Sequence, residues 1–273
     1  MIRTMAPDDV AQAVAWAARE GWNPGLADAP AFLAQDPGAF LMAEQDGAMR
    51  SCISVTKYGD GFGFLGFYIA APEVRGQGLG MAVWQAGMAR LEGRVVGLDG
   101  VVAQQDNYRK SGFHFAWNNA RYMAQAVQAG PPGVMLPRAD SVHFDALAAY
   151  DAACFGTPRP AFLRAWIDTP SHVALVLPGL RGFGVVRPAR HGSKIGPLFA
   201  DDAAGARRLF AALVAAAPPG PITLDVPEDH AQAVAIAREA GMTKVFETAR
   251  MYTAAPPPMA RDRLFGVTSL ELG

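Results

Sequence analysis

The sequence contains few cysteines, few lysines and no surplus of charge of either sign. Cys52 and Cys154 are the two cysteines, about a hundred positions apart in 273 residues. This excludes a disulfide framework and a zinc site, so both are expected in the core. Lys and Arg total 24 against 25 Asp and Glu. Without a basic surplus to neutralise phosphates, nucleic acid is not expected as a partner.

Long apolar runs are also missing. No stretch of 18 or more apolar residues occurs, and the N-terminus lacks the apolar centre of a signal peptide. We therefore expect no membrane segment and a cytoplasmic location. Half of the chain (51%) is hydrophobic and 18% is charged, the balance of a protein that buries a core. The length predicts about two domains.

Two stretches rich in Gly, Pro and Ala divide the chain. Residues 129–134 contain Gly-Pro-Pro-Gly, which breaks helix and strand and is typical of a linker. It would separate a first domain, residues 1–128, from a second domain, residues 135–254. The second stretch, Ala254-Ala255 and three successive prolines, lies at the end of the second domain, where a C-terminal tail, residues 255–273, begins. The tail is apolar for a chain end, so it is expected to dock as a strand.

The two halves share a signature of three parts. Each has a Leu-Asp pair, then a helix-like stretch that ends at a Gly, then an Ala-Arg pair whose Arg is nine positions after that Gly. The matched residues are Leu98-Asp99, Gly112 and Ala120-Arg121 in the first half, and Leu224-Asp225, Gly241 and Ala249-Arg250 in the second. The repeated order and spacing favour a duplication. We predict two tandem domains of mixed α/β type, each with a mixed sheet.

Hydrophobic periodicity predicts the elements of both halves. Asp8 or Asp9 is expected to cap the first helix, and Asp46-Gly47 to form a hairpin turn. Helices are predicted over 8–19, 80–91, 107–111, 144–154, 160–167, 203–217 and 228–240. Strands are predicted over 40–44, 51–57, 63–69, 95–98, 115–125, 172–177, 182–187, 194–200, 222–226 and 243–253.

The most informative stretch is residues 67–80, where an apolar strand ends at Pro72 and a Gly-rich turn leads into a helix. Glycines let the backbone approach a bulky ligand, and the amides and dipole of a helix N-terminus attract a pyrophosphate. Arg75 can add a charge-assisted hydrogen bond. The spacing excludes the nucleoside-triphosphate P-loop and fits the dinucleotide fingerprint poorly. An ordinary turn with an exposed Arg is the alternative.

The arrangement resembles motif A of the GNAT superfamily, the Gcn5-related N-acetyltransferases, whose signature is [RQ]-x-x-G-x-[GA]. Arg75, Gly78 and Gly80 match it after a strand and before a helix. The family's aromatic helix ending in Gly-Phe is matched by Tyr108 and Gly112-Phe113. The start of the chain, with Ile2-Arg3 and Pro7-Asp8-Asp9, also resembles the family.

The second half resembles a degenerate copy. Asp201 and Asp202 stand where the Gly-rich turn would bind phosphate, and carboxylates there would repel it while capping a helix. The resemblance thus implies one acyl-CoA site per chain, as in the two-domain, YitH-like group.

The resemblance implies that acetyl-CoA is the cosubstrate, that no metal is needed, and that the acceptor attacks the thioester directly. The cofactor-binding residues would be Phe67 and Ile69 through their backbone, and Arg75, Gly76, Gln77, Gly78, Leu79 and Gly80 around the pyrophosphate. Tyr108 would be the acid that protonates the departing thiolate, although a packed aromatic is the alternative. Asp99 is a candidate base, as is a relayed water.

Four residues are candidates for the acceptor site: Trp22, Asn23, Asp28 and Arg159. The first three follow the first helix, a region that often borders the acceptor pocket in GNAT proteins. Alternatively, Trp22 folds this loop onto the core, and Arg159 pairs with Asp151 across a turn. The C-terminal carboxylate of Gly273 is a further candidate.

The leading hypothesis is an N-acetyltransferase that acetylates a primary amine of a small molecule. Two alternatives stay open: a non-catalytic acyl-CoA sensor, and an enzyme that acetylates proteins. An open acidic groove would favour protein acceptors, whereas a pocket closed by the second half would favour small molecules. A homodimer is possible, and the sequence does not name the amine.

Overall fold

The computed structural model describes residues 1–127 and 135–273, so the predicted linker, residues 129–134, lies outside the described residues. The helices are α1 (Pro7–Arg19), α2 (Ala29–Gln35), α3 (Leu79–Arg90), α4 (Gln105–Lys110), α5 (Phe144–Phe155), α6 (Pro160–Asp168), α7 (Ala203–Ala216) and α8 (Ala231–Glu239). The strands are β1 (Ile2–Thr4), β2 (Phe40–Gln45), β3 (Ala48–Tyr58), β4 (Phe62–Ala70), β5 (Val95–Val101), β6 (His114–Ala124), β7 (Val173–Val176), β8 (Gly182–Pro188), β9 (Ser193–Ala200), β10 (Ile222–Pro227), β11 (Thr243–Tyr252) and β12 (Leu264–Gly266).

The predicted elements are confirmed with shifted ends, and two details differ. Helix α2 was not predicted; it begins with a Pro in its first turn, where a missing amide costs nothing. The cap of α1 is Ala6, not an Asp. Asp9 lies in the first turn and accepts the Ala6 amide at 2.8 Å. The turn at Asp46-Gly47 is confirmed, with φ of 54° and 70° as a type I′ hairpin requires.

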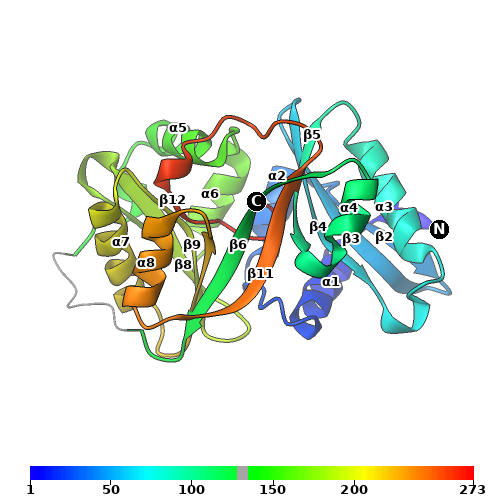
Figure 1. Ribbon diagram of the computed structural model, residues 1–273, viewed down its shortest axis with the longest axis horizontal. Helices are drawn as coiled ribbons and strands as arrows, with labels where there is room; N and C mark the ends of the chain where they lie inside the picture. Colours follow the sequence, from blue (N-terminus) through cyan, green and yellow to red (C-terminus); the bar gives the residue numbers. More distant parts are fainter. Residues whose placement is uncertain (128–134) are drawn as a thin grey trace.

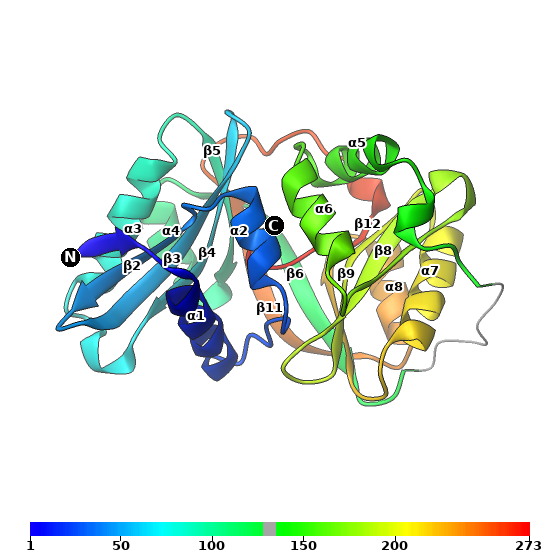
Figure 2. The ribbon, with the colours of Figure 1, turned by 180° about the vertical axis from the view of Figure 1, so that it is seen from behind.

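The described strands form one mixed sheet with the order β1-β2-β3-β4-β5-β11-β6-β10-β9-β8-β7, and β12 pairs with β9. Strands β4 and β5 run parallel, as do β9 and β10, and the other pairs are antiparallel. Figures 1 and 2 show helices on both faces: α3, α4, α7 and α8 on one, and α1, α2, α5 and α6 on the other. Apolar side chains between these layers form the core. No helix among the described residues is long and apolar enough to cross a bilayer.

The two halves exchange strands at the centre of the sheet. Strand β11, from the second half, lies between β5 and β6 of the first half. Strand β6, from the first half, lies between β11 and β10 of the second. Figure 1 shows β6 and β11 as two long neighbouring strands that join the halves. A cut of the chain near residue 128 therefore removes from each half a strand that its sheet needs.

The exchange gives the repeated Asp and Arg of the sequence their partners. Asp99 stands directly opposite Arg250 across β5 and β11, and Asp225 stands opposite Arg121 across β10 and β6. Each pair is buried and bidentate, with nitrogen–oxygen distances of 2.6 and 2.8 Å for Asp99–Arg250 and 2.7 and 2.8 Å for Asp225–Arg121. Each half thus supplies the Asp for one pair and the Arg for the other. Forked geometry makes these strong, directional contacts.

The C-terminal tail crosses from the second half to the first. After β12, its residues are buried, and the Leu272 carbonyl accepts a hydrogen bond from the Tyr58 hydroxyl in β3 at 2.9 Å. A Cβ at Gly66, in β4, would lie 2.1 Å from the Glu271 carbonyl oxygen, so only Gly admits the tail there. The tail therefore reaches the strand that precedes the Gly-rich turn.

The strand exchange predicts that residues 1–127 are not stable alone. Without β11 and β10, strands β5 and β6 have unpaired edges and lose both ion-pair partners, and exposed edges aggregate. We expect this fragment to aggregate, and to become soluble when co-expressed with residues 135–273. Size-exclusion chromatography and circular dichroism measure both. A monomeric residue 1–127 fragment with cooperative unfolding would contradict the prediction.

Candidate functional site

The Gly-rich turn offers backbone amides to solvent. Gly76 and Gly78 have φ of 80° and 84°, in the left-handed region that favours Gly, and Gly78 is the N-cap of α3. A Cβ at either position would meet no atom within 4 Å, so the turn is open. The first amides of a helix have no partner within it, and Gly78 has no side chain to accept them. These amides and the helix dipole form a site for an anion.

Polar side chains of the turn bind neighbouring protein atoms. Arg75 donates to the Ala70 carbonyl at 3.0 Å and to the Glu20 carboxylate at 2.6 Å, and its side chain is half exposed. Gln77 donates to the Glu73 carbonyl at 2.8 Å. The side chains of Arg75 and Gln77 thus hold the turn in place through hydrogen bonds to neighbouring residues. The backbone amides of the turn remain as donors for a ligand.

Strand β4 separates from β5 next to this turn. The two strands pair in parallel from Phe62 to Leu65 of β4. Beyond this, Phe67 has φ of 47° and the register with β3 shifts, as at a β-bulge. The bulge bends β4 away and leaves a gap between the two strands.

The amides that face the gap belong to different residues from those expected. The Ala71 amide donates to Arg50 of β3, and amides alternate sides along a strand, so the Ile69 amide also faces β3. Those of Tyr68 and Ala70 face the gap. Phe67 has its side chain in the core, and its carbonyl accepts from the Cys52 thiol. The amides of Phe67 and Ile69 therefore do not face the gap, whereas those of Tyr68 and Ala70 do.

A cavity of about 810 Å³ connects the gap with the second half. Its wall includes Tyr68, Ala70 and Arg75 from β4 and the turn, and Trp84 and Tyr108 from the helices α3 and α4. The far end, which we call the second-half end, is lined by Trp22, Arg121, Phe246, Thr248, Leu270 and Glu271. The last four come from β11 and the tail. Among the described residues, no cluster of His, Cys, Asp and Glu could hold a metal.

Tyr108 lies in the cavity wall between the two ends. Its ring stacks on Trp84, with centroids 5.8 Å apart. Gly100 makes room for it, because a Cβ there would lie 2.2 Å from the ring. Burial raises the pKa of Tyr108 to about 12, so the phenol keeps its proton and can donate it.

Asp99 also lines the cavity, but both of its oxygens are already bonded. They accept from Arg250, and one also accepts from Asn119 at 2.8 Å. Burial raises the pKa of Asp99, and the Arg250 guanidinium opposes that shift. The ion pair with Arg250, which the pairing of β5 with β11 sets up, explains the position of Asp99, and no role in proton transfer is needed to explain it.

Of the four predicted acceptor residues, Trp22 lines the cavity and the other three do not. Asn23 exchanges hydrogen bonds with the backbone of His191. Asp28 is buried against Arg187, at 2.9 Å. Arg159 is buried too, against Asp151. These three residues hold loops and helices together instead of facing the cavity.

Arg159 forms the ion pair with Asp151 that the sequence left open as an alternative. It is bidentate, with distances of 2.7 and 2.8 Å, and the same guanidinium donates to Thr268 of the tail. The guanidinium also lies 3.9 Å from the centre of the Phe155 ring. Arg159 therefore anchors the tail rather than a substrate.

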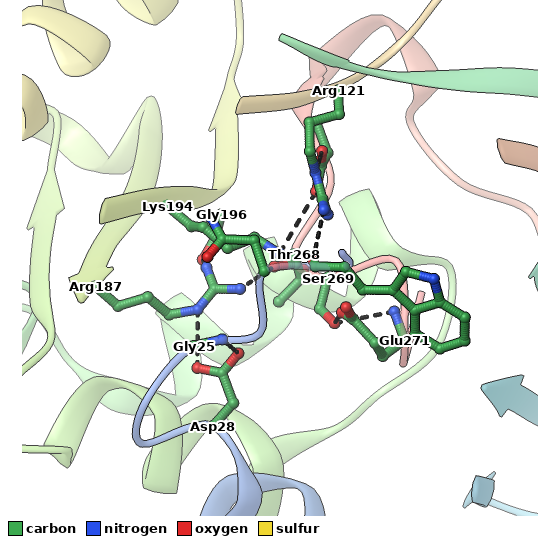
Figure 3. A network of polar contacts seen from close by, with 12 residues as sticks. Gly25, Asp28, Arg121, Arg187, Lys194, Gly196, Thr268, Ser269 and Glu271 are labelled. Atoms are coloured by element: carbon green, nitrogen blue, oxygen red, sulfur yellow. Dashed lines mark hydrogen bonds and ion pairs between the residues drawn. The ribbon is translucent and has the colours of Figure 1, made fainter. Parts of the chain in front are cut away.

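Sequence reasoning missed most of the second-half end. Phe246 and Thr248 lie on the exchanged strand β11, and Leu270 and Glu271 lie on the tail. Figure 3 shows Glu271 beside Ser269 within the polar network that Arg121, Lys194 and Arg187 share. The unusual burial of the tail was readable from its apolar sequence, but the strand that it would meet was not.

In the second half, the position of the Gly-rich turn is occupied by carboxylates. Asp202 caps α7 by accepting the Gly205 amide at 2.7 Å, as predicted, and pairs with Arg181. Asp201 accepts from the Tyr150 hydroxyl and lies 3.3 Å from Arg263. The protein's own carboxylates therefore already lie at the N-terminus of α7, where a phosphate would have to bind.

Comparisons with known proteins agree with the geometry. The acetyltransferase (GNAT) family matches residues 8–114, and an acetyltransferase (GNAT) domain matches residues 147–266. Holothin acyltransferase of Pseudoalteromonas sp. (strain SANK 73390) is 31% identical over 265 residues, covering 94% of this chain and 89% of that protein. The chain belongs to the GNAT family. It has two GNAT domains in tandem and is an acyltransferase.

Other GNAT relatives confirm the predicted resemblance. The uncharacterized N-acetyltransferase YitH of Bacillus subtilis is 25% identical over 89% of this chain and 87% of its own. A putative acetyltransferase from Pyrococcus horikoshii has the same fold, with a TM-score of 0.87 at 19% identity, over 100% of this chain and 95% of that one. A tandem GNAT protein from the clavulanic acid biosynthesis pathway has a TM-score of 0.63 at 13% identity, over 94% and 99%.

The buried ion pair gives a prediction about stability. Arg159→Ala leaves the Asp151 carboxylate buried without its partner, which costs about 3 to 5 kcal/mol. The free energy of unfolding, from urea denaturation, measures this. The paired variant Arg159→Met with Asp151→Leu removes both charges and is expected to recover most of the loss. An Arg159→Ala protein of unchanged stability would contradict the assignment.

Proposed function

We propose that this GNAT protein transfers an acetyl group from acetyl-CoA to a primary amine of a small molecule by direct attack. One observation carries the proposal: one cavity leads from the open Gly-rich turn, past Tyr108, to an end lined by β11 and the tail.

The donor fits the first half of the cavity. The amides at the start of α3 would hold the pyrophosphate, with Arg75 beside them. The pantetheine arm would lie in the gap between β4 and β5 and bond the amides of Tyr68 and Ala70. This brings the thioester to the bulge at Phe67, with Tyr108 across the cavity. The second half, whose corresponding turn has two carboxylates, would bind no CoA.

The chemistry then needs position and one proton donor. The amine nitrogen attacks the thioester carbon, and the carbon–sulfur bond breaks. Of the three protons on the acceptor's ammonium, one stays on the amide, one reaches the CoA sulfur through Tyr108, and one leaves to solvent. An amide aimed at the developing oxyanion is worth about 3 kcal/mol in such reactions.

The shape of the second-half end supports a small acceptor. Residues of strand β11 and of the tail line this end of the cavity, whereas a protein acceptor would need an open groove. The relative named holothin acyltransferase aligns with nearly the whole chain, which supports acyl transfer as the reaction. We test the function by following CoA release with a panel of amines, amino acids, polyamines and aminoglycosides. Acetyl-CoA binding without turnover on any of them would favour the sensor alternative.

Tyr108→Phe is expected to lower kcat by about tenfold or more and to leave acetyl-CoA binding intact, because it removes a proton donor but keeps the ring on Trp84. Steady-state kinetics and calorimetry measure the two effects. In the parent protein, the pKa of Tyr108 is about 12, so the phenol stays protonated below that pH. The rate should therefore show no fall that is due to deprotonation of Tyr108 as the pH rises from neutral towards 12.

Tyr68→Phe is the matched control for Tyr108→Phe. It removes a hydroxyl from the same cavity, near Gly80 at the start of α3. A small effect on kcat is expected. Equal effects of the two variants, or none from Tyr108→Phe, would remove the acid assignment.

Gly78→Ala is expected to raise the KM for acetyl-CoA, since a methyl group and a strained backbone disturb the amides at the N-cap of α3. The left-handed φ costs an L residue about 1 to 2 kcal/mol. Gly93→Ala is the control, because Gly93 has φ of 80° and equally open space away from the turn. Both variants should lose similar stability, and only Gly78→Ala should change the KM. A KM change of the same size in both would contradict the proposed phosphate site.

A further inference from the structure

At the second-half end of the cavity, the carboxylate of Glu271 can accept more hydrogen bonds than the protein gives it. The guanidinium of Arg121 donates hydrogen bonds to Asp225 and to the Trp22 carbonyl. The carboxylate of Asp99 accepts hydrogen bonds from Arg250 and Asn119. Within residues 1–127 and 135–273, the carboxylate of Glu271 receives a hydrogen bond from Ser269 alone. Figure 3 shows these two tail residues side by side.

Glu271 is held firmly at the place where the acceptor must arrive. Its amide donates to the Ser269 hydroxyl at 3.1 Å, so the same hydroxyl fixes both its backbone and its carboxylate. Its carbonyl oxygen packs on Gly66, the residue before the bulge at Phe67. The tail thus fixes the backbone of Glu271 next to the bulge of β4, where the thioester is proposed to lie, and Glu271 lines the cavity there.

The charge of Glu271 is not cancelled by a direct ion pair among the described residues. The two Asp–Arg pairs are neutral as units. The Nζ of Lys194 is buried, has no hydrogen-bond partner among the described residues, and lies 3.8 Å from Asp225. Burial lowers the pKa of Lys194, and the neighbouring Lys194 and Arg121 charges keep the pKa of Glu271 below its usual range. A buried carboxylate that receives one hydrogen bond and forms no direct ion pair can still accept hydrogen bonds from a cationic ligand.

The rest of this end is apolar. Trp22, Phe246 and Leu270 line it, and Thr248 adds a hydroxyl that has no partner among the described residues. These walls suit the hydrocarbon or aromatic body of a small molecule. They contain no uncommitted cation that could receive an acidic group.

We propose that Glu271 binds the ammonium group of the acceptor, and that the acceptor is therefore a small amine with an apolar body and no carboxylate. This inference rests on the proposed function and adds the class of acceptor to it. Arg121 cannot offset an acidic group, because its guanidinium is already bonded to Asp225 and Trp22. The tail that follows the second GNAT domain thus supplies selectivity to the site of the first.

Two probes of the same shape test the inference: phenethylamine and phenylalanine, which differ by one carboxylate. The parent protein is expected to have a kcat/KM at least about tenfold higher for phenethylamine, because the carboxylate of phenylalanine would be buried near Glu271 without a cation to pair with. Glu271→Gln should raise the KM for phenethylamine about tenfold or more, change kcat less, and reduce the preference between the probes. Glu271→Asp keeps the charge and should recover part of the KM.

Glu247→Gln is the matched control, because Glu247 is a half-exposed carboxylate on β11 that pairs with Lys244. It should change neither the KM nor the preference. Acetyl-CoA binding by calorimetry and the melting temperature show whether each variant is folded. A purely structural role for Glu271 would lower the melting temperature without changing the preference between the probes.

The outcomes separate the two proposals. If the panel shows acidic amines acetylated as fast as amines without a carboxylate, the inference about Glu271 is overturned and the proposed function stands. An unchanged KM in folded Glu271→Gln also overturns it. If Glu271→Gln does not fold, the preference of the parent protein and the KM of Glu271→Asp decide. If acetyl-CoA binds but no amine is acetylated, the proposed function fails, and the inference with it.

Discussion

The structure depends on two buried ion pairs that link its halves reciprocally. The first half supplies Asp99 to Arg250 of the second, and the second supplies Asp225 to Arg121 of the first. Breaking either pair would leave a charge buried without a partner, which is far more costly than the pair itself. The pairs therefore fix which strands are neighbours, and strands β6 and β11 are exchanged between the halves.

The site follows from this exchange. Strand β4 leaves β5 at the bulge, so the gap between them opens at the end of β5 where Thr248 of β11 pairs with Val101 on the other edge. Strand β11 brings Phe246 and Thr248 to the cavity, and the tail brings Glu271. One half thus provides the open Gly-rich turn and Tyr108, and the other half closes the far end. This division suits a duplicated fold in which one copy has lost its own turn to Asp201 and Asp202.

How far the sequence predicts this site varies with the kind of residue. The turn was readable because its glycines, its Arg and the flanking strand and helix are contiguous, and local backbone chemistry decides their conformation. Tyr108 was readable from its place before Gly112-Phe113. Which amides of β4 face the gap was not readable, because the positive φ of Phe67 and the register shift beside it arise where β4 packs on β3. Asn23, Asp28 and Arg159 looked equally available. In the structure Asn23 and Asp28 bind His191 and Arg187, which are distant in sequence, and Arg159 binds the nearby Asp151 and Thr268 of the tail.

The sequence by itself determined the two mixed α/β halves, the turn, the loss of that turn in the second half, and the repeated Asp and Arg. These depend on periodicity, spacing and local chemistry, which the chain carries within short segments. Only the tertiary structure decided that the repeated Asp and Arg pair across the halves, and that Glu271 reaches the cavity. Residues 99 and 250 meet through strand pairing, and residues 66 and 271 through packing of the tail on β4. Each pair is separated by most of the chain, and no short segment encodes which strand another segment will meet.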